Sequence, residues 1–167
     1  MENFWDNNEY AMENYISPEP VTEELIQKIE NEFGYKLPTS YINLMKIQNG
    51  GMPIKNCYPT TYNVGWGDNH VAIEGIYGLG YEKDYSIGLA QNSAIEDWGY
   101  PNIGLYFGDT PTAGHTMFAL SYLNCTKDGE PEVVHVEQEK DYKISVIAPD
   151  FQTFINGLVT EDSFEEK

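Results

Sequence analysis

The sequence contains no arginine: its nine basic residues are all lysines, set against 27 acidic residues. Arginine is the side chain best suited to hold a phosphate through two parallel hydrogen bonds. A net charge of −18 repels nucleic acid and anionic lipid, and it accelerates encounter with basic partners. The composition therefore predicts no nucleic-acid or membrane partner, and it leaves either solubility or attraction to a basic protein as the purpose of the acidity.

Long apolar runs are missing as well, and cysteine is scarce. No run approaches the roughly 20 apolar residues that span a bilayer, and the N-terminus lacks the basic patch and apolar core of a secretory signal. Cys57 and Cys125 could pair, but we favour two free thiols in a reducing compartment. These features predict a soluble, cytoplasmic protein.

Motifs for catalysis and metal binding are also lacking. His70, His115 and His135 lie far apart in the sequence, and none has metal-ligand spacing. Asp68 with His70 and Asp109 with His115 could form acid–base pairs, but no nucleophile elbow, Cys–His signature or phosphate loop accompanies them. The order of acids in a calcium loop is absent too. The sequence predicts no enzyme, no cofactor and no metal.

Three runs rich in β-branched and aromatic residues, 103–107, 116–123 and 132–137, are separated by turn residues and therefore predict strands. Asp128-Gly129 favours a reversal of the chain between the second and third. Both faces of the second run carry apolar groups, as expected for a strand inside a sheet with something packed on each side. We therefore expect 116–123 at the centre of an antiparallel sheet.

Two expectations concern polar residues of this region. His135, within the third run, is expected to be exposed on one face of its strand. A solvated strand face is expected at Glu130, Glu132, Glu137, Glu139 and Asp141.

Helical patterns flank the predicted sheet. Thr22 suits an N-cap, apolar residues recur at intervals of four after it, and Gly34 suits the end of that helix. Val71–Tyr77, with Glu74 in its middle, predicts one further strand. The expected helices are 4–15, 22–34, 37–49 and 149–158, with a helix or long turn at 84–98.

Helices, then strands, then a helix indicate an α+β fold. At 167 residues the chain is expected to form a single domain, 1–167, with its core at about 4–158 and an acidic, flexible tail at 160–167.

Several loop-rich segments place aromatic residues beside acids. Such a combination suits protein recognition, because rings supply contact area and carboxylates supply steering. Trp98 shares this setting, but we expect it to plug the edge of the sheet. The candidate partner-binding residues are Trp66, Asp68, Tyr81, Glu82, Asp84, Tyr85, Glu96, Asp97 and Asp109.

A series of motifs, in order along the chain, resembles the SUKH superfamily, the Smi/Knr-like group. The resemblance covers roughly residues 4 to 158. The motifs are Glu32-Phe33-Gly34-Tyr35, Leu37-Pro38, Tyr41, Asn49-Gly50-Gly51, Trp98-Gly99-Tyr100-Pro101, Ile103-Gly104, Gly108-Asp109, Gly114, Glu132–Val136 and Ala148–Leu158.

The resemblance implies an α+β domain with a twisted, mainly antiparallel sheet and helices packed against it. It also implies a non-catalytic role. The resemblance implies that bacterial members of the superfamily are mostly immunity proteins that bind and neutralise toxins, often nucleases, whereas fungal relatives resemble regulatory scaffolds in cell-wall signalling. A nuclease must have a basic cleft, so the acidity of this chain fits a basic toxin domain as its partner. A regulatory or scaffold module is the alternative, and the oligomeric state stays open.

Overall fold

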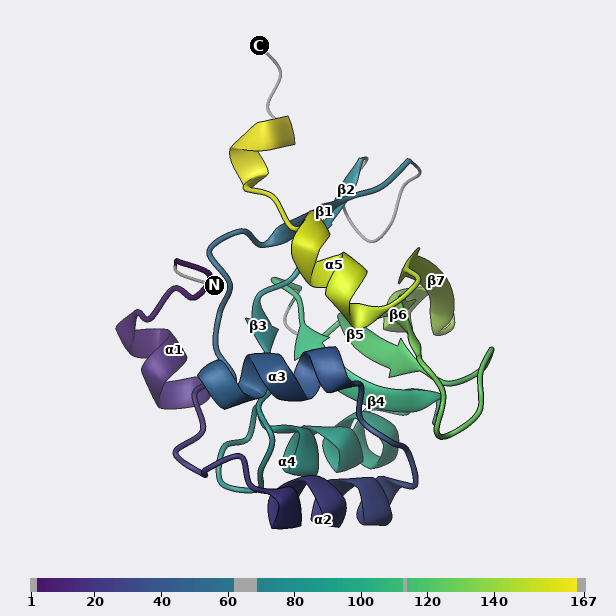
Figure 1. Cartoon of the computed structure of the whole chain (residues 1–167). Helices are drawn as coiled ribbons and strands as arrows, with labels where there is room; N and C mark the ends of the chain where they lie inside the picture. Colours follow the sequence, from purple (N-terminus) through teal and green to yellow (C-terminus); the bar gives the residue numbers. More distant parts are fainter. Residues whose placement is uncertain (1–2, 62–68, 113, 165–167) are drawn as a thin grey trace.

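The computed structural model describes residues 3–61, 69–112 and 114–164. Together its elements form a single α+β domain, as expected (Figure 1). The α-helices are α1 (Glu9–Asn14), α2 (Glu23–Phe33), α3 (Thr39–Ile47), α4 (Ile87–Asn92) and α5 (Phe151–Gly157). The strands are β1 (Cys57–Pro59), β2 (His70–Ala72), β3 (Gly75–Ile76), β4 (Gly104–Asp109), β5 (Thr116–Ser121), β6 (Glu132–Glu137) and β7 (Lys143–Ala148). Short turns of other helices are the π-helical η1 (Ser93–Asp97) and the 3-10 helices η2 (Gln138–Lys140) and η3 (Glu161–Phe164).

The main sheet is antiparallel with the strand order β3-β4-β5-β6-β7. All six residues of β5 are buried, so the prediction of a central strand covered on both faces is confirmed. The three predicted strands of this region are confirmed to within a few residues, whereas the sequence patterns did not predict β7.

The predicted strand Val71–Tyr77 is wrong, because two strands in different sheets occupy it. β1 and β2 form a small sheet of their own, and β3 belongs to the main sheet. The hydrogen-bond partners of the backbone change from one segment to another between Ile73 and Glu74. The N–H of Ile73 donates to the carbonyl of Asn56, whereas the N–H of Glu74 donates to the carbonyl of Asp109. Glu74 therefore lies at the junction of the two sheets.

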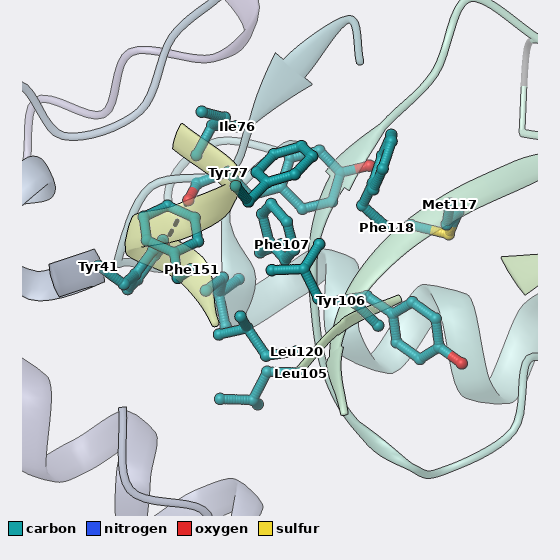
Figure 2. Packing of buried hydrophobic residues seen from close by; sticks show 14 of the residues in the cluster. Tyr41, Ile76, Tyr77, Leu105, Tyr106, Phe107, Met117, Phe118, Leu120 and Phe151 are labelled. Carbon is teal, nitrogen blue, oxygen red and sulfur yellow. Dashed lines mark hydrogen bonds between the residues drawn. The ribbon is translucent and has the colours of Figure 1, made fainter. Parts of the chain in front are cut away.

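One face of the main sheet is covered by α3 and α5, which lie across it in Figure 1. Figure 2 shows Phe107 at the centre of this packing. Its ring is 5.4 Å from that of Phe151 on α5 and 6.1 Å from that of Phe118 on β5. Tyr41 on α3 contacts Phe151 edge to face at 5.4 Å. Such aromatic pairs add to the free energy that burial contributes to folding.

The helix boundaries follow the expected capping residues. The Thr22 hydroxyl oxygen accepts from the N–H of Leu25 at 3.2 Å, and Gly34 adopts the left-handed conformation, with φ of 81°, that ends α2. α1 begins at Glu9, later than expected, because Asn8 caps it by accepting from the N–H of Ala11 at 2.8 Å.

Two polar residues of β6 correct the predicted solvated face. His135 is 1% exposed and Glu137 is 3% exposed, so neither points into solvent. The physical reason is that β7 pairs with β6 and places it inside the sheet, while Phe118 packs on the His135 ring at 5.4 Å. Burial lowers the pKa of His135 to about 4. The Oε1 atom of Glu137 lies 3.3 Å from the Nζ atom of Lys140.

Two further expectations concern covalent links and membranes. Cys57, which is buried, and Cys125, which is half-buried, are free thiols, as favoured. Within the described ranges, no helix combines the length and the apolar character needed to cross a membrane.

Gln91 of α4 takes the place of a missing strand. β3 has only two residues, so it leaves the start of β4 without a neighbour on that side. The Gln91 amide nitrogen donates to the carbonyl of Gly104 at 2.7 Å, and its amide oxygen accepts from the N–H of Tyr106 at 2.9 Å. Gln91 is 1% exposed, so α4 is held on β4 by a buried side chain that satisfies two backbone groups.

We predict that Gln91→Leu destabilises the protein by about 2 to 5 kcal/mol, because it leaves two buried backbone groups without hydrogen bonds. Urea denaturation measures this loss. Asn92→Ala, at the exposed neighbouring position of the same helix, is the control and is expected to cost about 0.5 kcal/mol or less. Equal losses in the two variants would contradict the role given to Gln91.

Candidate functional site

A pocket of about 630 Å³ lies between the C-terminal end of β4, the α4–η1 segment and the first helix. This volume is within the range of sites that hold small ligands or single side chains. Aromatic rings and carboxylates dominate its described lining. The residues that define its character are Tyr10, Glu74, Tyr77, Asp84, Tyr85, Trp98, Tyr100 and Asp109.

Asp109 is the last residue of β4, and its pKa is shifted further from its ordinary value than that of any other acid of the described pocket lining. The hydroxyl of Tyr15 donates to both of its carboxylate oxygens, at 2.9 and 2.7 Å, and the N–H of Gly75 donates to Oδ1 at 3.0 Å. Burial raises the pKa of Asp109 to about 7, and the negative charge of Glu74 acts in the same direction, although the hydrogen bond from Tyr15 opposes them. Asp109 therefore changes its charge near neutral pH.

Tyr15 reaches Asp109 because β3 starts with glycine. A Cβ atom on Gly75 would lie 2.0 Å from the Tyr15 ring, which is far inside van der Waals contact. The ring of Tyr15 also stacks on those of Tyr85, at 4.8 Å, and Tyr77, at 6.4 Å. Burial raises the pKa of Tyr15 and Tyr77, so both remain neutral hydrogen-bond donors at physiological pH.

Glu74 supplies a second carboxylate on the same side of the pocket. It is half-buried, and burial raises its pKa. Within the described part of the chain, no hydrogen bond reaches its carboxylate, in contrast to that of Asp109. Glu74 therefore keeps its acceptor oxygens available to a ligand.

Two large aromatic side chains stand exposed among the residues that line the pocket. Tyr10 of α1 is 49% exposed and Trp98, after η1, is 52% exposed. The expectation that Trp98 plugs the edge of the sheet is therefore wrong. The π-helical turn holds it instead: its N–H donates to the carbonyl of Ser93 at 3.1 Å, and its carbonyl accepts from the Tyr142 hydroxyl at 2.6 Å. With its backbone held on both sides, the indole projects from the pocket rim.

The turn that carries Tyr142 has an unusual backbone. Asp141 and Tyr142 have φ values of 57° and 58°, a left-handed conformation that side chains other than glycine rarely adopt. These two residues follow the 3-10 helix η2 and complete the connection from β6 to β7. They place the Tyr142 ring against Tyr100 at 5.3 Å, which supports that wall of the pocket.

The structure brings only some of the candidate residues together. Asp84, Tyr85 and Asp109 line the pocket. Tyr81 lies outside its described lining, where its hydroxyl donates to Glu32 at 2.9 Å and its ring lies 4.3 Å from the Lys28 Nζ atom. Exposed positions outside the described lining are occupied by Glu82, Glu96 and Asp97. Trp66 and Asp68 lie outside the described residues.

Sequence reasoning missed several members of the site. Glu74 had a usable signal, because an acid interrupts two short apolar runs there. The tyrosines had none, since they are distributed over α1 and its C-cap, the residue after β3 and the segment before β4. The missed residues are Tyr10, Tyr15, Glu74, Tyr77 and Tyr100.

The chemistry of the pocket favours an organic cation. Three carboxylates, of Glu74, Asp84 and Asp109, face the cavity, and neither lysine nor histidine belongs to its described lining. No group of three or more metal-ligating residues occurs in the described ranges, so the three acids do not form a metal site there. Aromatic faces next to carboxylates attract cations both by charge and through the ring quadrupole.

The structure is an α+β domain with a pocket lined by aromatic rings and carboxylates. The sequence pattern of the SMI1 / KNR4 family (SUKH-1) matches residues 20–157, which cover most of the chain and all of the main sheet. The chain belongs to this family, as the motifs predicted. The family is generally non-enzymatic, and it falls in a superfamily that contains immunity proteins. A comparison with curated proteins gave no match.

We predict that the carboxyl carbon of Asp109 titrates with a midpoint near pH 7, which NMR of the labelled protein measures directly. The pKa of this group in the unfolded chain is about 3.9. Between about pH 4 and pH 7, the folded protein therefore binds a proton that the unfolded chain does not. This contribution to stability is fully present below about pH 4 and is lost as pH rises through 7.

Asp109→Asn is expected to remove that part of the pH dependence of stability, on the order of 4 kcal/mol between pH 4 and pH 8. Tyr15→Phe removes a hydrogen bond to the carboxylate and is expected to move the midpoint of Asp109 upward. A midpoint below pH 5 in the wild type would contradict the described environment.

Proposed function

We propose that this protein is a non-enzymatic immunity protein, which binds and neutralises a cognate toxin domain by protein–protein contact. The observation that carries the proposal is the pocket, where exposed Tyr10 and Trp98 accompany three carboxylates and no cation is found in the described lining. Exposed aromatic residues next to a concave, water-excluding surface are typical of the residues that dominate binding energy in protein interfaces.

The charge of the chain supports a basic partner. A net charge of −18 produces a field that accelerates encounter with a basic surface by ~10- to 10³-fold. A toxin that acts on nucleic acid carries such a surface in its active cleft, because it must hold phosphates. Rapid encounter benefits an immunity protein, which must capture its toxin before damage occurs.

Family membership supports binding rather than catalysis. The arrangement around Asp109 is consistent with this, because the donors from Tyr15 and Gly75 fix its carboxylate in place. A fixed carboxylate at the end of a strand is well suited to a permanent contact with a partner.

The direct test is co-expression with the C-terminal domain of a large secreted toxin encoded by a neighbouring gene. We expect the wild-type protein to keep the cells alive and to bind the purified toxin domain with an affinity that falls at least tenfold between 50 mM and 500 mM salt. Continued cell death would contradict the proposal. A cellular partner for this protein, with no toxin gene nearby, would favour a regulatory or scaffold role instead.

Trp98→Ala is predicted to weaken the toxin complex by about 30-fold or more, because it removes a large aromatic contact at the pocket rim. Leu123→Ala is the matched control: Leu123 is 59% exposed and lies outside the described pocket lining, so its truncation should change the affinity less than about twofold. Titration calorimetry compares the two, and similar losses would place the interface elsewhere.

A further inference from the structure

We propose that the pocket holds the guanidinium group of one arginine of the toxin domain, with Glu74 and Asp109 as its carboxylate partners. This inference rests on the proposed function, since it names the group by which the partner is recognised. It goes further in assigning a single cationic side chain to a defined cavity, in place of a general attraction between charged surfaces.

The first argument is the number of free acceptors. The Asp109 carboxylate accepts from three donors: the Tyr15 hydroxyl, which both oxygens share, the N–H of Gly75, and its own backbone N–H. Each carboxylate oxygen can accept about two hydrogen bonds. The carboxylate therefore has room for one further donor, and Glu74 offers both of its oxygens, since nothing in the described ranges donates to them.

These acceptors match a guanidinium better than an ammonium. A guanidinium presents five N–H donors in a rigid plane, and two of them fit the two oxygens of one carboxylate in parallel. Glu74 can take such a pair, and Asp109 can take a third donor from the same plane. The three N–H donors of an ammonium diverge from a single nitrogen atom, so they do not form a planar fork.

The second argument is the shape and material of the walls. Tyr77 and Tyr85 lie nearly parallel, with an angle of 7° between their rings and 5.9 Å between centroids. Together with Tyr100 and Trp98 they contribute aromatic surface to the same lining as the carboxylates. Arginine stacks its planar head on such faces and packs its apolar stem along them.

The third argument is the electrostatic balance of the cavity. Glu74 and Asp109 lie partly buried in the pocket, the exposed Asp84 adds a carboxylate to its lining, and neither lysine nor histidine occurs among the described lining residues. Burial and the repulsion from Glu74 both disfavour the charged form of Asp109 in the free protein. A cation that enters the pocket relieves the repulsion, which is a favourable change that occurs only on binding.

The arrangement predicts that binding of the arginine releases a proton. Burial and Glu74 hold the pKa of Asp109 at about 7, so part of the population is protonated at neutral pH. A guanidinium beside the carboxylate favours its charged form. The groups that face Asp109 are Tyr15, Glu74, Tyr77 and Tyr85, of which the tyrosines stay neutral because burial raises their pKa.

The test uses the whole protein at pH 8, where Asp109 is ionised, and three small probes. N-acetyl-arginine N-methylamide carries the proposed group, the citrulline analogue has the same shape without the charge, and the lysine analogue has the charge without the plane. We expect the arginine probe to give saturable NMR shifts at the amides of Gly75 and Tyr77, with the citrulline analogue at least ~10-fold weaker.

The test compares Glu74→Gln/Asp109→Asn with Glu24→Gln/Asp128→Asn. Each double variant removes two carboxylates, but Glu24 and Asp128 are exposed and lie outside the described pocket lining. Asn is tolerated before Gly129, because Asn-Gly suits a turn as well as Asp-Gly does. We expect the pocket variant to bind the arginine probe at least ~10-fold more weakly than the surface variant. Glu74→Gln alone serves if the double variant does not fold, since no described hydrogen bond is lost.

Equal losses in the two double variants would overturn the proposal, because they would show a general field effect. Binding of citrulline as tight as that of arginine, or tighter binding of lysine, would also overturn it. The toxin assay separates the hypothesis of an arginine site from the hypothesis of an immunity function. If the pocket variant still protects cells as well as wild type, the arginine site is refuted and the immunity function stands. If the wild type fails to protect, the function is refuted whatever the probe does.

Discussion

The hydrogen bond from Tyr15 to Asp109 is the constraint on which the described pocket depends. It joins residues 94 positions apart in sequence, and so it ties the end of α1 to the end of β4. The contact requires Gly75 at the start of β3, because any side chain there would occupy the space of the Tyr15 ring. With Tyr15 in place, Tyr77 and Tyr85 stack beside it, and both line the same pocket as Glu74 and Asp109.

The parts of this fold that could be predicted from sequence are those controlled by local chemistry. Thr22 and Gly34 mark the ends of α2 because capping and left-handed conformations depend on single residues. The apolar pattern of 116–123 predicted the central strand, observed at Thr116–Ser121, because it indicates burial on both faces. β7 was not predicted, because buried and exposed residues do not alternate regularly along it. Without β7 as a neighbour of β6, the burial of His135 and Glu137 was not predicted either.

The candidate site was only partly predictable, for a related reason. Asp84, Tyr85 and Asp109 were found because acids and aromatics adjoin in their segments. Glu74 was hidden by the exchange of hydrogen-bond partners between Ile73 and Glu74, which divides one apparent strand between two sheets. Tyr15 was hidden by distance along the chain. Contacts of this length are set by the tertiary fold, and no local pattern encodes them.

The global charge and the local pocket act at different ranges in this account. The excess of carboxylates steers a basic partner over long distances, and the pocket selects one cation at contact. The most direct measurement is a crystal structure of this protein bound to the toxin domain encoded beside it. The account predicts an arginine of the toxin inside the pocket, with its guanidinium on Glu74 and Asp109. A complex in which this pocket opens to solvent, away from the toxin, would contradict it.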